Sequence, residues 1–418
     1  MIEDKKPRFF YGYIIVAASV VIQLLMLGTY CTFGIFFTPL SSELGWTSAA
    51  TSGAYSLVYF LFGFLGIVTG RLTDKFGPRI VLIACGLLLG LGYLLMSQVS
   101  SIWQLYLFFG VTIGIGMSGV DVPILSTVAR WFVKKRGAAT GIAKAGAGIG
   151  IFIMPLLANW AISGYGWRSA YVVLGIIALA GVVATALFLK RDPGQIGLLP
   201  DGAAEVETGD SNISTRQFSL REAIGTRQFW LFSAVCFLLI FCMQVALVHI
   251  APHAIELGIS ATIAATTVST IGGASILGRI GMGSISDRLG CKSTFIVAIS
   301  LLIVSLVLLQ FAKEAWLFYI FATLYGIAHG AIFTLISPML AELFGLRSLG
   351  AILGVVFFIG TTGGALGPVL SGRIFDVTGS YQLSFLICLA LSIIAIVLIS
   401  FLRPISNETL RKIHGELH

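Results

Sequence analysis

The sequence predicts an all-α membrane protein with twelve transmembrane helices arranged as two six-helix, pseudo-symmetric halves. Three observations predict this fold class: an apolar composition, a series of long apolar stretches, and an internal repeat. Of the 418 residues, 57% are hydrophobic and 11% are charged. Soluble domains are about 45–50% apolar and about 25% charged, so lipid is the expected solvent for most of this chain.

The apolar stretches are typical of membrane helices and not of barrel strands. Segments such as 13–37, 80–96 and 383–402 are long enough to cross a bilayer as helices. Strands of a membrane barrel would be segments of about ten residues with alternating polarity. A helix also pairs its backbone polar groups internally, as the bilayer requires.

Glycine, proline and charged residues divide the chain into spans. The first six are expected near 13–40, 47–70, 80–98, 102–128, 138–163 and 168–190. The second six are expected near 227–255, 261–283, 293–312, 315–342, 350–375 and 380–402. Residues 191–226 form the one long polar stretch and are expected to be a linker. The predicted domains are therefore an N-terminal half, 1–190, and a C-terminal half, 227–418.

The net charge of +8 is concentrated on every second inter-helix segment and on both termini. This is the positive-inside pattern of membrane proteins. It predicts a multi-pass protein of a cell membrane with both termini and the 191–226 linker in the cytoplasm. Because the charges follow the membrane topology, no nucleic-acid partner is expected.

The two halves repeat each other at an offset of 213 residues. The aligned pairs include Pro39 with Pro252, Asp74 with Asp287, Lys75 with Arg288, Gly77 with Gly290 and Pro155 with Pro368. Six plus six spans in the same orientation are parallel repeats. A carrier needs two such lobes because its central site must face each side in turn, whereas a channel does not.

Two loops resemble a known signature. GRLTDKFGPR at Gly70–Arg79 and its copy GSISDRLGCK at Gly283–Lys292 resemble the loop motif of the major facilitator superfamily. The resemblance implies the major facilitator fold and a latch on the cytoplasmic side that stabilises the outward-facing state. A tight turn with solvated charges is the alternative. The implied gate residues are Asp74, Arg79, Asp287 and Arg288.

A second motif narrows the resemblance. WFVKKRGAATGIAKAGAGIG at Trp131–Gly150 is similar to the signature of monocarboxylate transporters and oxalate:formate antiporters, and implies a bacterial homologue of them. Its small residues Gly141, Ala145 and Gly148 are expected on one helix face, where they allow a neighbouring helix to approach closely.

Arg279 is the foremost candidate for binding substrate. It lies eight residues before Asp287, about 12 Å along the helix and hence deep in the bilayer. Ionisable groups at that depth are costly and usually functional. A guanidinium matches a carboxylate with two parallel hydrogen bonds. Arg279 also coincides with the substrate arginine of both resembled families. An arginine paired structurally within its own half is the alternative.

Asp121 and Lys144 are predicted to pair in the cytoplasmic half of two adjacent spans. They are candidates for proton coupling, with Asp121 exchanging a proton as substrate comes and goes. A buried ion pair that only fastens two helices is the alternative. A lysine at position 144 departs from both families, in which a small or apolar residue is usual.

Other pocket residues are implied by the alignment with these families. His249, near the outer end of its span, is a further proton-coupling candidate, because histidine can titrate near neutral pH. A neutral, hydrogen-bonded histidine is the alternative for both His249 and His329. His329 is implied as a pocket residue that could also handle protons. The remaining implied pocket walls, for which packing is the alternative role, are Tyr30, Cys31, Tyr325 and Phe333.

Two departures from the families bear on the substrate. Oxalate exchangers have a second cation where this chain has Val356, and animal monocarboxylate carriers have an aspartate where it has Ser275. If Asp121 offsets Lys144, the cavity keeps one excess positive charge, which suits a monocarboxylate such as lactate or pyruvate. If Lys144 is free to bind, a dicarboxylate fits.

The sequence therefore predicts a secondary active transporter of small monocarboxylates, a proton-coupled symporter working by alternating access. The cell-negative potential repels an anion by about 2.3 kcal/mol per 100 mV, so uptake needs a co-transported proton or an exchanged anion. The alternatives are a dicarboxylate or formate-type anion exchanger and a drug-efflux carrier of the same fold.

Enzymatic activity is not expected. The chain has no cofactor motif and no evident nucleophile–base pair at one depth, and its linker is too short for a catalytic domain. The expected partners are a small organic anion, protons and the lipid bilayer, with no cofactor and no metal. The protein is expected to function as a monomer, with the bacterial inner membrane as its location.

Overall fold

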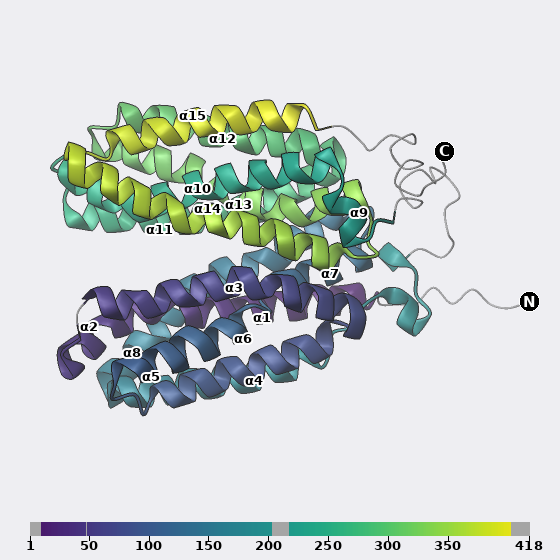
Figure 1. Ribbon diagram of the computed structural model, residues 1–418, viewed down its shortest axis with the longest axis horizontal. Coiled ribbons are helices and arrows are strands. Elements are labelled where there is room, and N and C mark those ends of the chain that lie inside the picture. Colours follow the sequence, from purple (N-terminus) through teal and green to yellow (C-terminus); the bar gives the residue numbers. More distant parts are fainter. Residues whose placement is uncertain (1–9, 47, 203–216, 403–418) are drawn as a thin grey trace, which may run out of the picture.

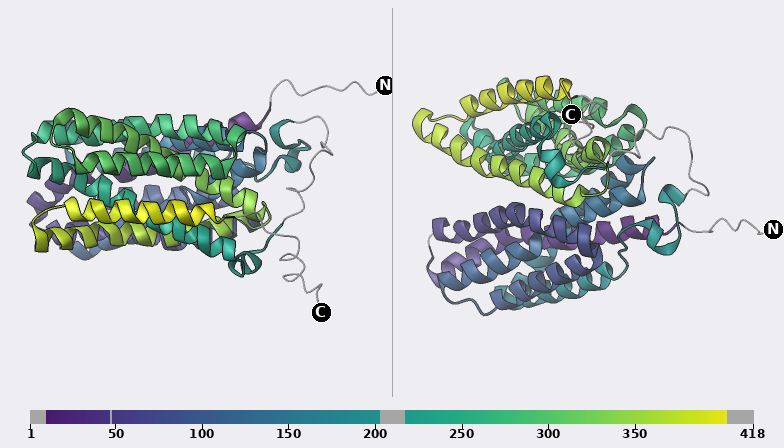
Figure 2. Two further views of the ribbon diagram at one scale, coloured as in Figure 1. Left: turned by 90° about the horizontal axis from the view of Figure 1, so that it is seen from above. Right: turned by 45° about the vertical axis from the view of Figure 1, so that its right-hand side comes forward.

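The computed structural model describes residues 10–46, 48–202 and 217–402, and no strand occurs among these residues. The helices form two bundles that lie side by side with parallel long axes (Figure 1). Two further views show the same parallel packing (Figure 2). The predicted all-α fold class is therefore confirmed.

The N-terminal bundle is built from the helices up to Ala186. These are α1 (Gly12–Cys31), α2 (Phe33–Leu44), α3 (Ser48–Phe76), α4 (Pro78–Met96), α5 (Ile102–Leu105), the π-helix η1 (Tyr106–Ile113), α6 (Gly114–Met117), α7 (Val122–Trp131) and α8 (Arg136–Ala186). Two short 3-10 turns follow, η2 (Pro193–Ile196) and η3 (Pro200–Gly202).

The helix α8 folds back on itself at Gly166. Gly166 has φ 77° and ψ 163°, which glycine adopts readily because it lacks a Cβ. A straight helix of this length would extend about 75 Å, but both ends of α8 lie near Trp131. Arg136 donates to the carbonyl of Phe132, and Trp131 Nε1 donates to the carbonyl of Lys190 at 2.9 Å. The helix therefore contains two antiparallel segments.

The C-terminal bundle begins after residues 203–216, which lie outside the described residues. Its helices are α9 (Leu220–Ile224), α10 (Arg227–Glu256), α11 (Ala261–Leu289), α12 (Cys291–Gln310), α13 (Ala315–Phe344), α14 (Leu349–Thr378) and α15 (Gln382–Ser400). Among the described residues, ten helical segments are long and apolar enough to cross a membrane. Counting α8 as two segments and including the 29-residue α11 would give the predicted twelve.

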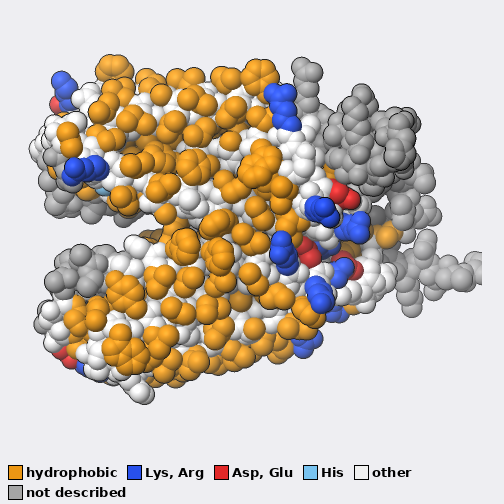
Figure 3. All heavy atoms as spheres, viewed as in Figure 1, with side chains coloured by type: hydrophobic (Ala, Val, Ile, Leu, Met, Phe, Trp, Pro, Cys, Tyr) orange, Lys and Arg blue, Asp and Glu red, His pale blue; other side chains and the backbone are white. Residues whose placement is uncertain are grey.

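Each bundle has an apolar core of its own. One core is formed by residues between 15 and 189, and the other by residues between 218 and 402 together with Val122, Leu125 and Ala129 of α7. The outer surface is also apolar along the length of both bundles (Figure 3). Phe152 and Val369, for example, are 72% and 69% exposed. This is the surface expected of a protein solvated by lipid.

The two ends of the molecule differ in charge. Lys and Arg side chains gather at the end where α3 and α11 finish and α8 begins (Figure 3). We call this the basic end. At the opposite end, α2 is tied to the turn of α8, where the Glu43 carboxylate accepts hydrogen bonds from Arg168 and Trp167. These bonds hold the pKa of the Glu43 carboxyl below its usual range.

The bundles touch closely where α3 meets α14 and α8 meets α11. A Cβ at Gly70 would lie 2.2 Å from the carbonyl oxygen of Gly350, and one at Gly141 would lie 2.1 Å from that of Arg279. Glycine is therefore required at both crossings. For Gly141 this agrees with the small-residue face predicted for α8. Toward the end opposite the basic end the bundles diverge and leave a notch (Figure 3).

Candidate functional site

The segment Ile102–Trp131 crosses the N-terminal bundle as a broken helix. The π-helix η1 and the short α6 precede a turn at residues 118–121, after which α7 begins. Pro123 explains the break, because proline lacks the N–H that would bond the fourth preceding carbonyl and its ring crowds that carbonyl. Such irregular backbone is tolerated at membrane depth only where protein buries it or where it lines a cavity.

Polar side chains from two neighbouring helices bond the carbonyl groups of this turn. Gln23 of α1 donates from Nε2 to the carbonyl of Val120 at 2.7 Å. Thr69 of α3 donates its hydroxyl to the carbonyl of Ser118 at 2.9 Å. The break is thus held in place by two side chains of the bundle.

Asp121 ends the turn and forms an ion pair with Lys144 of α8. Lys144 Nζ and Asp121 Oδ1 are 2.5 Å apart, and Gln23 Nε2 donates to the same oxygen at 2.9 Å. Asp121 is 6% exposed and Lys144 is 4% exposed. The predicted pairing is confirmed. Neutralising one member would leave the other as an unpaired buried charge, which is strongly destabilising.

Arg279 reaches the same region from α11 of the other bundle. Its Nη1 donates to the backbone carbonyl of Lys144 at 3.2 Å, and its Nε is buried with no hydrogen-bond partner among the described residues. Gly148 leaves room for it, since a Cβ there would lie 3.2 Å from Arg279 Nη1. A buried guanidinium with an unused N–H can bind an anion strongly, because carboxylates accept charge-assisted hydrogen bonds from it.

The charges of this cluster do not cancel. Arg279 and Lys144 carry two positive charges and Asp121 carries one negative charge, and Arg279 interacts electrostatically with Asp121 and with Lys144. One excess positive charge remains at the contact between the bundles. A single carboxylate would neutralise it.

Two aromatic residues of α13 border these charges. The Phe333 ring centroid lies 5.8 Å from Lys144 Nζ, and the rings of His329 and Phe333 are 5.0 Å apart. His329 Nδ1 is buried without a hydrogen-bond partner in the described part of the chain. The structure therefore brings the predicted residues His329 and Phe333 together with Lys144.

The N-terminal bundle supplies the facing wall. The ring of Tyr30 stacks on Tyr55 of α3 with centroids 4.6 Å apart. Cys31 at the end of α1 is partly exposed and lies within electrostatic range of the Arg279 guanidinium. Tyr59, one turn after Tyr55, likewise lies within range of the Asp121 carboxylate.

Two further predicted site residues, Tyr325 and His249, bond carbonyl groups of the C-terminal bundle. Tyr325 is fully buried, and its hydroxyl donates to the carbonyl of Met243 on α10. His249 bonds the carbonyl of Pro368 through Nε2 at 3.0 Å and stacks on Tyr381. Both contacts stay within the C-terminal bundle. The Tyr325 ring also lies against His329, with centroids 6.0 Å apart, so its place in the pocket wall stays a prediction. The contacts of His249 do not include the Asp121–Lys144 pair.

The two loop carboxylates each bond the first residues of a helix in the opposite bundle. Asp74 at the end of α3 accepts the N–H groups of Gly350 and Ala351 at 3.2 and 2.9 Å. It also pairs with Arg130 at 2.7 Å. Because a helix N-terminus carries free N–H groups and a partial positive charge, it stabilises a carboxylate there.

Asp287 at the end of α11 makes the pseudo-symmetric contact. It accepts the N–H groups of Gly137 and Ala138, the first residues of α8 after Arg136, at 2.6 and 2.9 Å. Arg79 and Arg288 are exposed, and the carboxylates take the partners just described. The predicted gate positions therefore hold Asp74 and Asp287 at contacts between the bundles, while the two arginines lie outside these contacts.

Several residues of the site escape prediction from the sequence. The amide of Gln23 within an apolar span was a usable signal, because polar groups in membrane helices are costly and usually have a partner. Tyr55, Tyr59 and Arg130 gave no such signal, since aromatic residues are frequent in the spans and arginines are frequent at their ends.

Comparisons with known proteins place this geometry in context. The family model described as Major Facilitator Superfamily matches residues 18–309 and 254–416. Monocarboxylate transporter 13 of Rattus norvegicus is 28% identical over 407 residues, covering 96% of this chain and 92% of that protein. Monocarboxylate transporter 2 of Homo sapiens is 25% identical, covering 96% and 87%. The MFS transporter asaE of Aspergillus flavus is 28% identical, covering 85% and 80%.

Solved structures share the fold at lower identity. The human organic anion transporter MFSD10 superposes with a TM-score of 0.74 and 15% identity, covering 93% of this chain and 99% of that one. The E. coli fucose:proton symporter superposes with a TM-score of 0.67 and 16% identity, covering 94% and 100%.

Proposed function

Because this chain belongs to the major facilitator superfamily, whose members are membrane transporters, we propose that it carries small monocarboxylates such as lactate or pyruvate together with protons. One observation carries the proposal. A buried arginine with an unused N–H sits beside an ion pair, leaving one excess positive charge. The names of the monocarboxylate transporters that the chain resembles support the same substrate class.

In this proposal the substrate carboxylate binds Arg279. The Nη1 group is held by the carbonyl of Lys144, so the guanidinium is fixed in orientation before substrate arrives. Nε–H and the remaining N–H groups are the donors for the carboxylate. Phe333 and Tyr30 then contact the short apolar part of the acid, and His329 Nδ1 is a candidate partner for its keto or hydroxyl oxygen.

Proton coupling is assigned to the Asp121–Lys144 pair. A proton from the outer solution moves onto a carboxylate oxygen of Asp121, which weakens its bond to Lys144. The freed Lys144 then adds to the attraction for the substrate anion. On the other side of the membrane the substrate leaves, Lys144 pairs with Asp121 again, and the proton returns to water. Each cycle moves one anion and one proton, without net charge.

Alternating access follows from the contacts between the bundles. We propose that the basic end faces the cytoplasm, that both termini lie there, and that Asp74 and Asp287 close that side. The halves 1–190 and 227–418 would move as units joined by the linker 191–226. With this orientation, the notch at the opposite end indicates an outward-facing state.

The alternatives differ in what they ask of Lys144 and Arg279. An anion exchanger for dicarboxylates would require Lys144 to leave Asp121 and bind a second carboxylate. A drug-efflux carrier would not require Arg279. The short ion pair at Lys144 favours the monocarboxylate. A monomer in the bacterial inner membrane remains the prediction for assembly and location.

A ligand screen tests the proposal. The melting temperature of the purified protein is measured with lactate, pyruvate, succinate, oxalate, benzoate and a cationic dye. A ligand that binds only the folded state raises the free energy of unfolding, by about 2.7 kcal/mol at a hundred times its Kd, and so raises the melting temperature. We expect monocarboxylates to raise it and Arg279→Ala to abolish the effect. Stabilisation by dicarboxylates alone, or by dyes in both proteins, would reject the proposal.

A further inference from the structure

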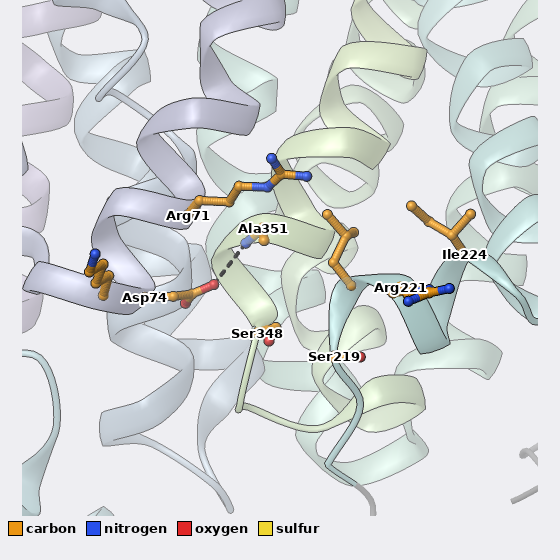
Figure 4. A pocket seen from close by; sticks show the side chains of 9 residues that line it. Arg71, Asp74, Ser219, Arg221, Ile224, Ser348 and Ala351 are labelled. Carbon is orange, nitrogen blue, oxygen red and sulfur yellow. Dashed lines mark hydrogen bonds between the residues drawn. The ribbon is translucent and has the colours of Figure 1, made fainter. Parts of the chain in front are cut away.

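A pocket at the basic end lies outside the substrate site. It has a volume of about 670 Å³ and is formed by α3, α14 and the short α9 (Figure 4). Its polar lining residues come from all three: Arg71, Asp74, Lys75, Ser219, Arg221 and Ser348. The pocket therefore joins the N-terminal bundle, the C-terminal bundle and the end of the linker.

The pocket is strongly basic. Arg71 projects from α3 on one side and Arg221 lies on α9 at the other, with Ser348 and Ala351 at the start of α14 between them (Figure 4). Lys75 of α3 also lines the pocket. Asp74 is the acidic residue of this lining, and its oxygens are already bonded to Arg130 and to the N–H groups of α14. The three cations are exposed and line a space in which the lining carboxylate is occupied, and Lys75 Nζ also lies 5.0 Å from the ring centroid of Phe76.

The pseudo-symmetric corner of the molecule is built differently. There Asp201 accepts the N–H groups of Val133 and Lys134 at 2.9 and 2.8 Å. At the pocket corner, the equivalent N–H groups of Leu346 and Arg347 bond the neutral amide oxygen of Gln217 at 3.3 and 2.8 Å. A carboxylate of the chain itself therefore supplies negative charge at one corner, whereas an amide takes its place at the other.

The repeat shows the same difference in its cations. The residues 213 positions after Arg71 and Lys75 are Ser284 and Arg288. Arg71 therefore has no cationic counterpart in the copy, although the copy has Lys135 where the pocket has Ser348. Because the copy forms the same helix contact with Ser284 in place of Arg71, Arg71 is not needed to build the loop, and its charge points to an anion from outside the chain.

The α3 wall of the pocket borders the lipid. Along α3 the exposed residues Phe64, Val68, Leu72 and Phe76 follow one another at intervals of four, so they form one continuous apolar stripe on the helix. Arg71 and Lys75 lie beside the end of this stripe. An anion with acyl chains could place its headgroup in the pocket and its chains along the stripe. Basic pockets between membrane helices bind phospholipid headgroups in this way.

We propose that this pocket binds the phosphate headgroup of an anionic phospholipid. Arg71, Lys75 and Arg221 would contact the phosphate, and the acyl chains would lie on the α3 stripe. The bound lipid bridges α3 to α14 and α9, so it holds the two bundles together at the basic end beside the Asp74 contact. Anionic lipid would thereby favour the state in which this end is closed.

The test measures the melting temperature of purified protein in detergent during titration with short-chain phosphatidylglycerol. Phosphatidylcholine of the same chain length and inorganic phosphate are titrated in parallel. We expect phosphatidylglycerol to stabilise the protein at far lower concentration than the other two. In Arg71→Gln/Lys75→Gln/Arg221→Gln the apparent affinity should fall on the order of a hundredfold, since each such cation contributes a factor of about five.

A matched variant removes the same charge elsewhere. Arg79→Gln/Lys135→Gln/Arg288→Gln changes three exposed cations that do not line the pocket, and it should keep the affinity of the wild type. An equal loss of affinity for phosphatidylglycerol in both triple variants would show that only the net charge matters, and would overturn the proposal. Equal stabilisation by inorganic phosphate would overturn the lipid as the source. If the pocket triple variant does not fold, Arg221→Gln alone should weaken binding about fivefold.

Discussion

At the residue scale, the function proposed for this chain depends on a few charged side chains in an apolar surrounding. Arg279, Asp121 and Lys144 could all be predicted, because a charge within a membrane helix is conspicuous in the sequence. Gln23 could not be placed, because its partners are an oxygen of Asp121 and the carbonyl of Val120, which is accessible only where the helix breaks. Partners supplied by the backbone leave no mark in the sequence.

The shape of the Arg279 side chain can be tested separately from its charge. Arg279→Lys keeps the positive charge but loses the planar fork that binds a carboxylate through two bonds. Loss of a hydrogen bond to a charged group costs about 1.5–3 kcal/mol. We therefore expect the affinity for lactate to fall about tenfold to a hundredfold, measured by ligand-dependent melting. Unchanged affinity would argue against binding by the fork.

Variants of Asp121 and Lys144 distinguish a proton-coupling site from an ion pair that only fastens two helices. Asp121→Asn alone leaves Lys144 unpaired and buried, and should destabilise the protein by about 3–5 kcal/mol. The double variant Asp121→Asn/Lys144→Met removes both charges and should recover stability. It should still bind lactate through Arg279 but lose the response of uptake to a pH gradient. A double variant that still responds to the gradient would show that the pair only fastens the helices.

At the element scale, helix ends and breaks decide where these side chains lie. The spans and their order could be predicted from hydropathy and from the repeat. The break at residues 118–121 was not predicted, although Pro123 lies directly after it, because proline is also found within unbroken membrane helices when neighbours bond the freed carbonyl groups. The partners of Asp74 and Asp287 were missed for the same reason as those of Gln23, since backbone N–H groups are invisible in a sequence.

The contact between Asp74 and α14 should control the opening of the basic end. Asp74→Asn removes the negative charge that interacts with Arg130 and with the first N–H groups of α14. The neutral amide would hold the two bundles less firmly, so the basic end should open more often. A cysteine introduced by Gly66→Cys, where α3 crosses α14 at Gly354, should then react faster with a thiol reagent added at that end.

The copy of the repeat provides the control for this experiment. Asp287→Asn acts on the equivalent contact with α8 and should also promote opening. Arg79→Gln should have no effect, because Arg79 lies outside both contacts. A labelling rate that is unchanged in both aspartate variants would show that Asp74 and Asp287 do not control the opening of the basic end.

At the scale of the whole molecule, two bundles with separate apolar cores meet near one end and diverge at the other. The repeat in the sequence predicts two similar halves, but it cannot predict which side is closed, because both states of a carrier share one sequence. One difference between the corners, Asp201 against Gln217, likewise lies in segments that the repeat alignment does not cover.

The outward-facing arrangement can be tested with the cysteines of the chain. All six are free, and Cys31, beside Arg279, is partly exposed while the other five are buried. A negatively charged, membrane-impermeant thiol reagent should therefore label Cys31 from the side opposite the basic end, and lactate should protect it. Cys31→Ala should abolish the labelling. Equal labelling from the basic end would contradict the outward-facing arrangement.

The most direct test of monocarboxylate–proton symport is uptake of labelled lactate into proteoliposomes under an inward proton gradient. We expect lactate to accumulate above its outside concentration while the gradient lasts, and to equilibrate when a proton ionophore collapses it. Liposomes with Arg279→Ala should show neither. Uptake by the wild-type protein that is the same with and without the gradient would contradict symport.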